Sequence, residues 1–135
     1  QLQIANHTYS HAALTSLTDE QIVQELTRND EEIRRLFGVS SKPYFRPPYG
    51  YYDARVLAVA ASCGFTRPVL WYGSLADSSN ISSAEVYAYA EKYALAQHIV
   101  IGHLNYRGVV SELDRIRALL DRRGLTTVTI RDYYG

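Results

Sequence analysis

Two histidines near the start of the sequence raise its first chemical question. His7 and His11 stand four residues apart in the stretch IANHTYSH, directly after a short apolar run. This spacing puts both imidazole rings on one side of a turn, where they can bind one divalent ion. Neutral imidazole favours zinc over magnesium, with cobalt and nickel as alternatives. The other interpretation is a pair of loop histidines that bond the backbone, and the spacing alone does not decide between the two.

Two further segments carry groups that could act on a substrate. In FRPPYG, Arg46 ends an extended run, and the following Pro47 and Pro48 stiffen the loop. Gly50 has no side chain, so the backbone of this loop can approach a ligand closely. Such a loop can present a backbone N–H to a developing oxyanion. His103 ends the apolar segment IVIGH, which is a typical setting for a general acid or base. An ordinary turn and a hydrogen-bonded histidine at a strand end are the alternatives.

Short apolar runs alternate with amphipathic helices along the chain. The hydrophobic spacing predicts helices over residues 18–38, 53–64, 82–94 and 109–124, with extended runs at 2–6, 44–50, 67–73, 98–105 and 125–130. This order indicates a parallel sheet covered by helices. Because chemistry gathers at the carboxyl ends of such strands, the segments at 7–11, 46–50, 71–77 and 103 are expected at one rim.

Several helix ends carry their own signals. Thr18 and Gln21 predict a capping box, and Asp53 is a predicted N-cap. Gly38, Gly64 and Gly124 end the helices predicted over residues 18–38, 53–64 and 109–124.

Composition and charge narrow the class of protein. The 135 residues fit one domain over 1–135, with 47% hydrophobic and 21% charged residues. Fourteen basic residues balance fourteen acidic ones, so no nucleic-acid partner is expected. The single cysteine excludes an internal disulfide, and without an 18-residue apolar run no membrane span is expected.

Four sequence blocks, taken together, resemble one known family. NHTYSH, FRPPYG, LWYGSLAD and IVIGH, in this order, resemble the blocks of the polysaccharide deacetylases, the NodB-homology family or carbohydrate esterase family 4. The likeness runs from about residue 3 to about residue 130. It implies a distorted (β/α) barrel in the α/β class and metal-dependent hydrolysis of acetyl groups. The implied substrate is an acetylated polysaccharide or oligosaccharide of the chitin, peptidoglycan or acetylxylan type, and the implied location is secreted or at the cell envelope.

The resemblance assigns metal binding and catalysis to particular residues. By this likeness, His7 and His11 bind the metal, Arg46 holds the catalytic base, and the backbone N–H of Tyr49 donates to the oxyanion. His103 matches the general acid that protonates the leaving group.

The resemblance also places residues around the acid and the substrate. Asp77 matches the aspartate that orients His103, and Ile101 stands where the family has a residue lining the acetyl pocket. Pro48 and Tyr49 match positions that contact the substrate.

The sequence departs from the family pattern in two places. The block Thr-Phe-Asp-Asp-Gly, which supplies the base and the third metal ligand, does not precede His7 in this sequence. We therefore expect the C-terminal portion of a cleaved or truncated enzyme, a barrel without its first strands, and a separate N-terminal fragment as a candidate partner. Ser74 replaces the first aspartate of the third block, and Ser78 replaces the tryptophan that usually walls the site. The loss of the tryptophan predicts a more open, polar groove.

Two other functions stay open at this stage. Without the base, the domain would be a catalytically inactive remnant that binds carbohydrate or metal. A third interpretation is a structural α/β domain whose histidines are unrelated to one another. An ion at His7 and His11 would argue against this third interpretation.

Overall fold

The computed structural model describes residues 2–135, which form two compact units. Unit 1 contains Gln1–Leu70 and Thr129–Gly135, and unit 2 contains Trp71–Val128. The single domain expected over residues 1–135 stays a prediction, and residue 1 lies outside the described residues.

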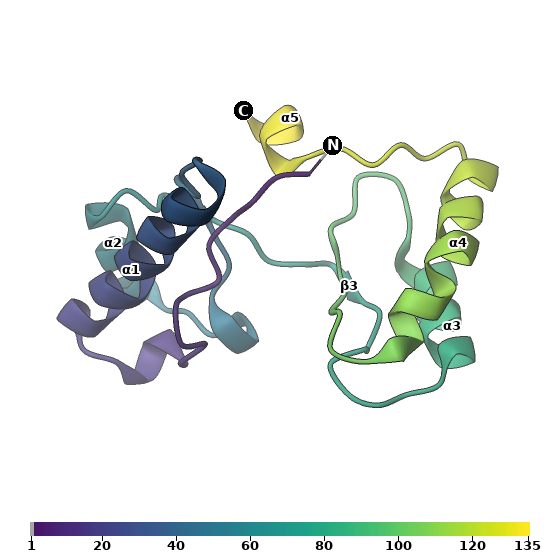
Figure 1. Cartoon of the computed structure of the whole chain (residues 1–135), viewed down its shortest axis with the longest axis horizontal. Helices are drawn as coiled ribbons and strands as arrows, with labels where there is room; N and C mark the ends of the chain where they lie inside the picture. Colours follow the sequence, from purple (N-terminus) through teal and green to yellow (C-terminus); the bar gives the residue numbers. More distant parts are fainter. Residues whose placement is uncertain (1) are drawn as a thin grey trace. The chain divides into compact units, whose positions relative to one another are not determined.

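Unit 1 combines two packed helices with short parallel strands. Helices α1 and α2 lie side by side (Figure 1). Strands β1 and β2 pair in parallel, and Asn6 forms a parallel bridge to Phe45. The elements of unit 1 are 3-10 helix η1 (Leu14–Ser16), α1 (Asp19–Phe37), β1 (Tyr44–Phe45), 3-10 helix η2 (Pro48–Gly50), α2 (Ala54–Ser62), β2 (Arg67–Pro68) and α5 (Ile130–Tyr134).

The core of unit 1 lies between these helices and strand β1. Ile22 and Leu26 stand four residues apart on one face of α1, and both are fully buried. The rings of Phe45 and Phe65 meet edge to face at 6.3 Å between centroids. Burial of each such side chain stabilises the fold by roughly 1.5–3 kcal/mol. The fully buried core residues are Leu14, Ile22, Leu26, Phe45, Val56, Ala60 and Phe65.

The predicted helix ends of unit 1 are confirmed. Thr18 and Gln21 form the capping box at the start of α1, and Gly38 follows its end with φ 70°. The Asp53 carboxylate accepts a hydrogen bond from the backbone N–H of Val56 at 2.8 Å, which caps α2. These signals are local, so the sequence alone is sufficient to predict them.

Unit 2 places two parallel strands under a helix pair. Its elements are β3 (Gly73–Ser74), α3 (Ser83–Tyr93), β4 (Val100–Ile101) and α4 (Arg107–Arg122), and β3 pairs with β4. Helices α3 and α4 pack together (Figure 1). A Cβ atom at Gly73 would collide with the ring of Tyr93, so the absence of a side chain lets α3 approach β3.

Two predicted strands differ most from the structure, and the other three are reduced to the Asn6 bridge, β1 and β4. The closing strand over 125–130 is wrong, because residues 125–129 have no regular structure and Ile130 begins α5. The Thr129 hydroxyl accepts from the Asp132 N–H in a capping box, which starts a helix where a strand was expected. The extended run over 67–73 divides into β2 and β3, which pair with different partners.

A buried carboxylate joins α1 to the segment before β1. The Asp30 side chain is only 5% exposed and accepts hydrogen bonds from the Ser41 N–H, the Ser41 hydroxyl, the Ser40 hydroxyl and Nε of Arg34. Burial raises the pKa of Asp30, but the hydrogen bonds from Ser41, Arg34 and Ser40 outweigh it and lower the pKa from 3.8 to about 2. The ionised carboxylate therefore stabilises the folded state.

We predict that Asp30→Asn lowers the free energy of unfolding at pH 7 by about 2 kcal/mol. The folded pKa lies below the unfolded value, so the unfolded state binds more protons and stability rises with pH. The difference in the free energy of unfolding between the unchanged chain and Asp30→Asn is fully present above about pH 4 and disappears as the pH falls through about 2. Urea unfolding at several pH values measures this difference.

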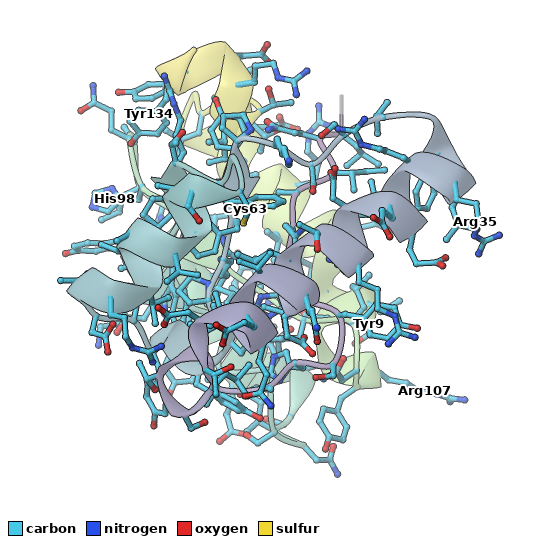
Figure 2. All side chains as sticks on the ribbon, turned by 90° about the vertical axis from the view of Figure 1, so that its left-hand side faces the viewer. Tyr9, Arg35, Cys63, His98, Arg107 and Tyr134 are labelled. Carbon is cyan, nitrogen blue, oxygen red and sulfur yellow. The ribbon has the colours of Figure 1, made fainter. Side chains whose placement is uncertain are left out.

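Glu32→Gln on the same helix is the matched control. Glu32 pairs with Arg35, which points away from α1 (Figure 2), and both side chains are more than 40% exposed. Exposed pairs contribute little, so this change should cost below about 0.5 kcal/mol. A loss for Asp30→Asn that is equally small, or independent of pH, would contradict the prediction.

Candidate active site

The loop that carries the two histidines is a tight turn rather than a helix. The ring centroids of His7 and His11 lie 4.8 Å apart, with the rings at 79° to one another. Thr8 and His11 both have positive φ, at 66° and 62°. The Thr8 hydroxyl accepts a hydrogen bond from the His11 N–H at 3.1 Å and closes the turn. The side chains are therefore brought together by backbone geometry that the spacing alone did not reveal.

A backbone contact fixes the tautomer of His7. Its Nδ1 lies 2.8 Å from the carbonyl oxygen of Arg46. Because a carbonyl oxygen only accepts hydrogen bonds, Nδ1 must carry the proton. The Nε2 of neutral His7 then keeps its lone pair. Metal-binding histidines typically have this arrangement, in which the ring nitrogen that does not bind the ion donates to a carbonyl.

Asn6 anchors the histidine loop to the core. Its side chain is 1% exposed and makes four hydrogen bonds. The amide NH₂ donates to the Leu26 carbonyl at 2.9 Å and to the Ser41 hydroxyl at 3.1 Å. The amide oxygen accepts from the N–H of Thr8 at 2.9 Å and from the side chain of Asn29 at 3.0 Å. All donors and lone pairs of the amide are used.

The backbone of Asn6 completes the same attachment. Its N–H donates to the Tyr44 carbonyl at 3.2 Å, and its carbonyl accepts from the Arg46 N–H at 2.8 Å. The residue just before His7 is thereby held in line with β1. Sequence reasoning missed Asn6, although a polar residue that ends an apolar run was a visible signal.

Glu25 holds the other side of the loop. Its carboxylate accepts from the N–H groups of Tyr9 and Ser10 and from the Ser10 hydroxyl, at 2.7–2.9 Å. Burial raises the pKa of Glu25, but these hydrogen bonds and the charge of Arg28 outweigh it, and the pKa is lowered. Tyr9 lies at the surface beside α1 (Figure 2), with the Arg28 guanidinium 3.8 Å from its ring centroid. Glu25 was also missed from the sequence.

The FRPPYG loop lies against this turn. The Tyr49 ring meets the His11 ring at 4.8 Å between centroids, and Tyr49 has φ 59° inside η2. Within residues 2–135 the Tyr49 N–H donates no hydrogen bond. Arg46 donates from Nε to the Val69 carbonyl at 3.1 Å, and burial lowers the pKa of its guanidinium. Pro48 is buried beside them.

Unit 2 contains a buried aspartate that binds one histidine. The Asp77 side chain is 2% exposed, and its Oδ2 accepts from the backbone N–H of His103. Its Oδ1 lies 3.1 Å from Nδ1 of His103, whose side chain is 30% exposed. The carboxylate thus fixes both the position of the ring and the nitrogen that donates, which leaves Nε2 for proton transfer. Ile101, 8% exposed, ends β4 two residues before this histidine.

Ser74, one of the two residues that depart from the family pattern in the third block, has a structural role here. The Ser74 hydroxyl accepts a hydrogen bond from the Ala76 N–H at 2.9 Å, and Ala76 has φ 56°. This turn precedes Asp77 directly. Ser74 therefore stabilises the backbone that presents the aspartate, a contact that an aspartate side chain could also make.

The predicted site residues fall into two groups. Unit 1 brings together His7, His11, Arg46, Pro48 and Tyr49, and unit 2 brings together Asp77, Ile101 and His103. The single rim expected for both groups stays a prediction.

The donor set of unit 1 fits part of a zinc site. His7 and His11 supply two nitrogen donors on adjacent rings. Among residues 2–135, no group of three or more histidine, cysteine, aspartate or glutamate side chains could hold a metal ion. Because catalytic zinc sites usually have three protein ligands, His7 and His11 could supply two of the three.

The chain is similar in sequence to enzymes that act on polysaccharides. A family described as "Polysaccharide deacetylase" matches residues 2–68. "Chitin deacetylase 1" of Cryptococcus neoformans var. grubii is 52% identical over 69 residues, 51% of this chain and 14% of that protein. "Peptidoglycan-N-acetylmuramic acid deacetylase PdaA" of Bacillus subtilis is 31% identical over 132 residues, 96% of this chain and 50% of that protein. The chain therefore spans half or less of these relatives.

Solved structures share the fold. A family 4 carbohydrate esterase from Streptomyces lividans, in complex with acetate, has a TM-score of 0.85 and 26% identity, over 95% of this chain and 65% of that one. The structure described as "T48 deacetylase with substrate" has a TM-score of 0.85 and 29% identity, over 96% of this chain and 62% of that one. The predicted α/β fold of the deacetylase type is confirmed. The chain belongs to the polysaccharide deacetylase family.

Proposed function

We propose that these residues form part of a metal-dependent hydrolase that removes N- or O-acetyl groups from a polysaccharide. The polymer would be of the chitin, peptidoglycan or acetylxylan type, as the names of the relatives suggest. The observation that carries the proposal is the His7 and His11 pair, whose ring centroids lie 4.8 Å apart and in which Nδ1 of His7 bonds to the Arg46 carbonyl, as the second ring nitrogen of metal-binding histidines typically does.

A divalent ion would be held by His7 and His11, with zinc favoured and cobalt or nickel as alternatives. When bound, it would supply Lewis-acid chemistry toward a water molecule and the acetyl carbonyl. A third donor and the catalytic base would come from beyond residues 2–135. A separate N-terminal fragment of the same protein is one source that we propose for both.

The chain's own residues would act on the acetyl group in complementary ways. The N–H of Tyr49, which donates no hydrogen bond within residues 2–135, would donate to the oxyanion. Arg46 would hold the carboxylate of the base. Pro48 and Ile101 would contact the acetyl group and the sugar.

The leaving group would take its proton from His103. Its Nδ1 faces Asp77, so Nε2 is the nitrogen that would donate to the departing amine or alcohol. Asp77 would hold the ring in one orientation throughout, because both of its oxygens bond to His103.

A second candidate function is a catalytically inactive domain that binds carbohydrate or metal. The observation that favours it is the two-ligand set, since residues 2–135 contain no cluster of three metal-binding side chains. Acetate release decides between the two functions, because only the hydrolase produces it.

A location outside the cell or at its envelope is part of the same proposal. Polymers such as chitin and peptidoglycan are wall components, so an enzyme that modifies them would meet them there. No helix within residues 2–135 has the length and apolar character that a membrane crossing requires.

We predict that His11→Ala abolishes zinc retention, because one remaining imidazole cannot hold the ion. Elemental analysis after dialysis measures the zinc content of the purified protein. His98→Ala is the matched control, since His98 also places Nδ1 against a backbone carbonyl, that of Ala96 at 2.7 Å. Zinc that stays bound to His11→Ala, or that leaves both variants equally, would contradict the metal site.

We predict that His103→Ala lowers kcat for acetate release by about 10² or more, because the leaving group loses its proton donor. The assay uses a purified protein that contains this chain and that releases acetate from an acetylated chito-oligosaccharide. Zinc content should be unchanged, which separates loss of the acid from loss of the metal. Full turnover by His103→Ala would assign the proton transfer to another group.

A further inference from the structure

We propose that Tyr51, together with Tyr49, forms a stacking platform that binds a pyranose ring of the polymer beside the His7 and His11 pair. The inference rests on the proposed function and adds a binding residue to it. It starts from exposure: Tyr49 is 59% exposed, Tyr51 is 58% exposed and Tyr52 is 43% exposed. Rings this exposed contribute little to folding, so three of them in one short loop indicate a binding surface.

The rings form a continuous row that leads away from the metal-binding pair. The His11 and Tyr49 rings meet at 4.8 Å between centroids, at 74°. The Tyr49 and Tyr51 rings follow at 5.7 Å and 40°. A ligand on Tyr51 would therefore lie next to the candidate acetyl site rather than in it. That is where the neighbouring sugar of a bound polymer is expected.

The backbone that carries the platform is rigid. Pro47 and Pro48 fix two φ angles, and their carbonyl oxygens accept hydrogen bonds from the N–H groups of Gly50 and Tyr51, both at 3.1 Å. Asp53 then caps α2 two residues later. Because the rings start from a stiff loop, binding a ligand costs little conformational entropy.

The chemistry of the platform selects a neutral sugar. Residues 49–52 carry no charge, and the nearest carboxylate in sequence, that of Asp53, bonds to the Val56 N–H. A pyranose whose ring substituents are all equatorial presents a face of axial C–H bonds, which packs against an aromatic ring. An axial hydroxyl interrupts that face. The platform should therefore favour β-1,4-linked, all-equatorial pyranosides, a class that includes chitin and xylan.

Calorimetric titration of the 135-residue chain with chitohexaose tests the platform without any hydrolysis. Tyr51→Ala should raise Kd about tenfold, the scale of one lost stacking contact. Tyr51→Phe keeps the ring and should stay within about twofold of the parent chain. Tyr133→Ala is the matched control, because Tyr133 is 53% exposed and pairs with Tyr134 at 4.9 Å in the same unit. Its Kd should not change.

The choice of oligosaccharide provides a second test. β-1,4-Mannohexaose carries an axial hydroxyl on every ring and should bind more weakly than chitohexaose. Equal Kd values for Tyr51→Ala and the parent chain, equal binding of the two hexasaccharides, or no binding of chitohexaose by the parent chain would each overturn the platform. Failure of the proposed function has a different signature, namely tight chitohexaose binding without zinc retention or acetate release.

Discussion

The geometry of unit 1 depends on the hydrogen bonds of the Asn6 side-chain amide, whose donors and lone pairs all have partners. This buried side chain joins a carbonyl of α1, the Ser41 hydroxyl and the N–H of Thr8, while its backbone pairs with the segment of β1. A buried amide that loses a partner pays the full desolvation cost of the orphaned group, about 1–3 kcal/mol. Loss of any one of the four partners would therefore destabilise the anchor from which the histidine loop starts.

Each later feature of the candidate site follows from that anchor. Because Asn6 aligns the chain with β1, the carbonyl of Arg46 reaches Nδ1 of His7 and selects its tautomer. The Asp30 carboxylate supports the same arrangement from behind, since it holds the Ser41 hydroxyl that Asn6 also uses. In unit 2 a carboxylate has the same role, because both oxygens of Asp77 bond to His103. In both units an oxygen acceptor bonds to Nδ1 of an imidazole and thereby orients the ring.

The sequence predicts the local parts of this structure and misses the long-range ones. Helix ends at Thr18, Gly38 and Asp53 depend on side chains within three or four positions, so pattern alone finds them. The strands are only two residues long, and a closing strand was expected where the Thr129 capping box starts α5. Strand pairing depends on partners far along the chain, which hydrophobic spacing does not contain.

The same distinction applies to the candidate site. The histidines were found because their residue type and spacing are unusual, and the family resemblance added Tyr49 and Asp77. Asn6 was missed because its partners lie 20 and 35 positions away, and Glu25 because it reaches back 15 positions to Ser10. Tyr51 looked like one of many tyrosines until its ring contact and exposure were known.

The tautomer of His7 in the metal-free chain tests the central claim most directly. Long-range ¹H–¹⁵N NMR at neutral pH distinguishes a protonated ring nitrogen from one with a free lone pair. The anchored loop predicts that the neutral ring carries its proton on Nδ1 and not on Nε2, because Nδ1 donates to the Arg46 carbonyl. A proton on Nε2, or rapid exchange between both forms, would show that the loop does not prepare His7 for an ion.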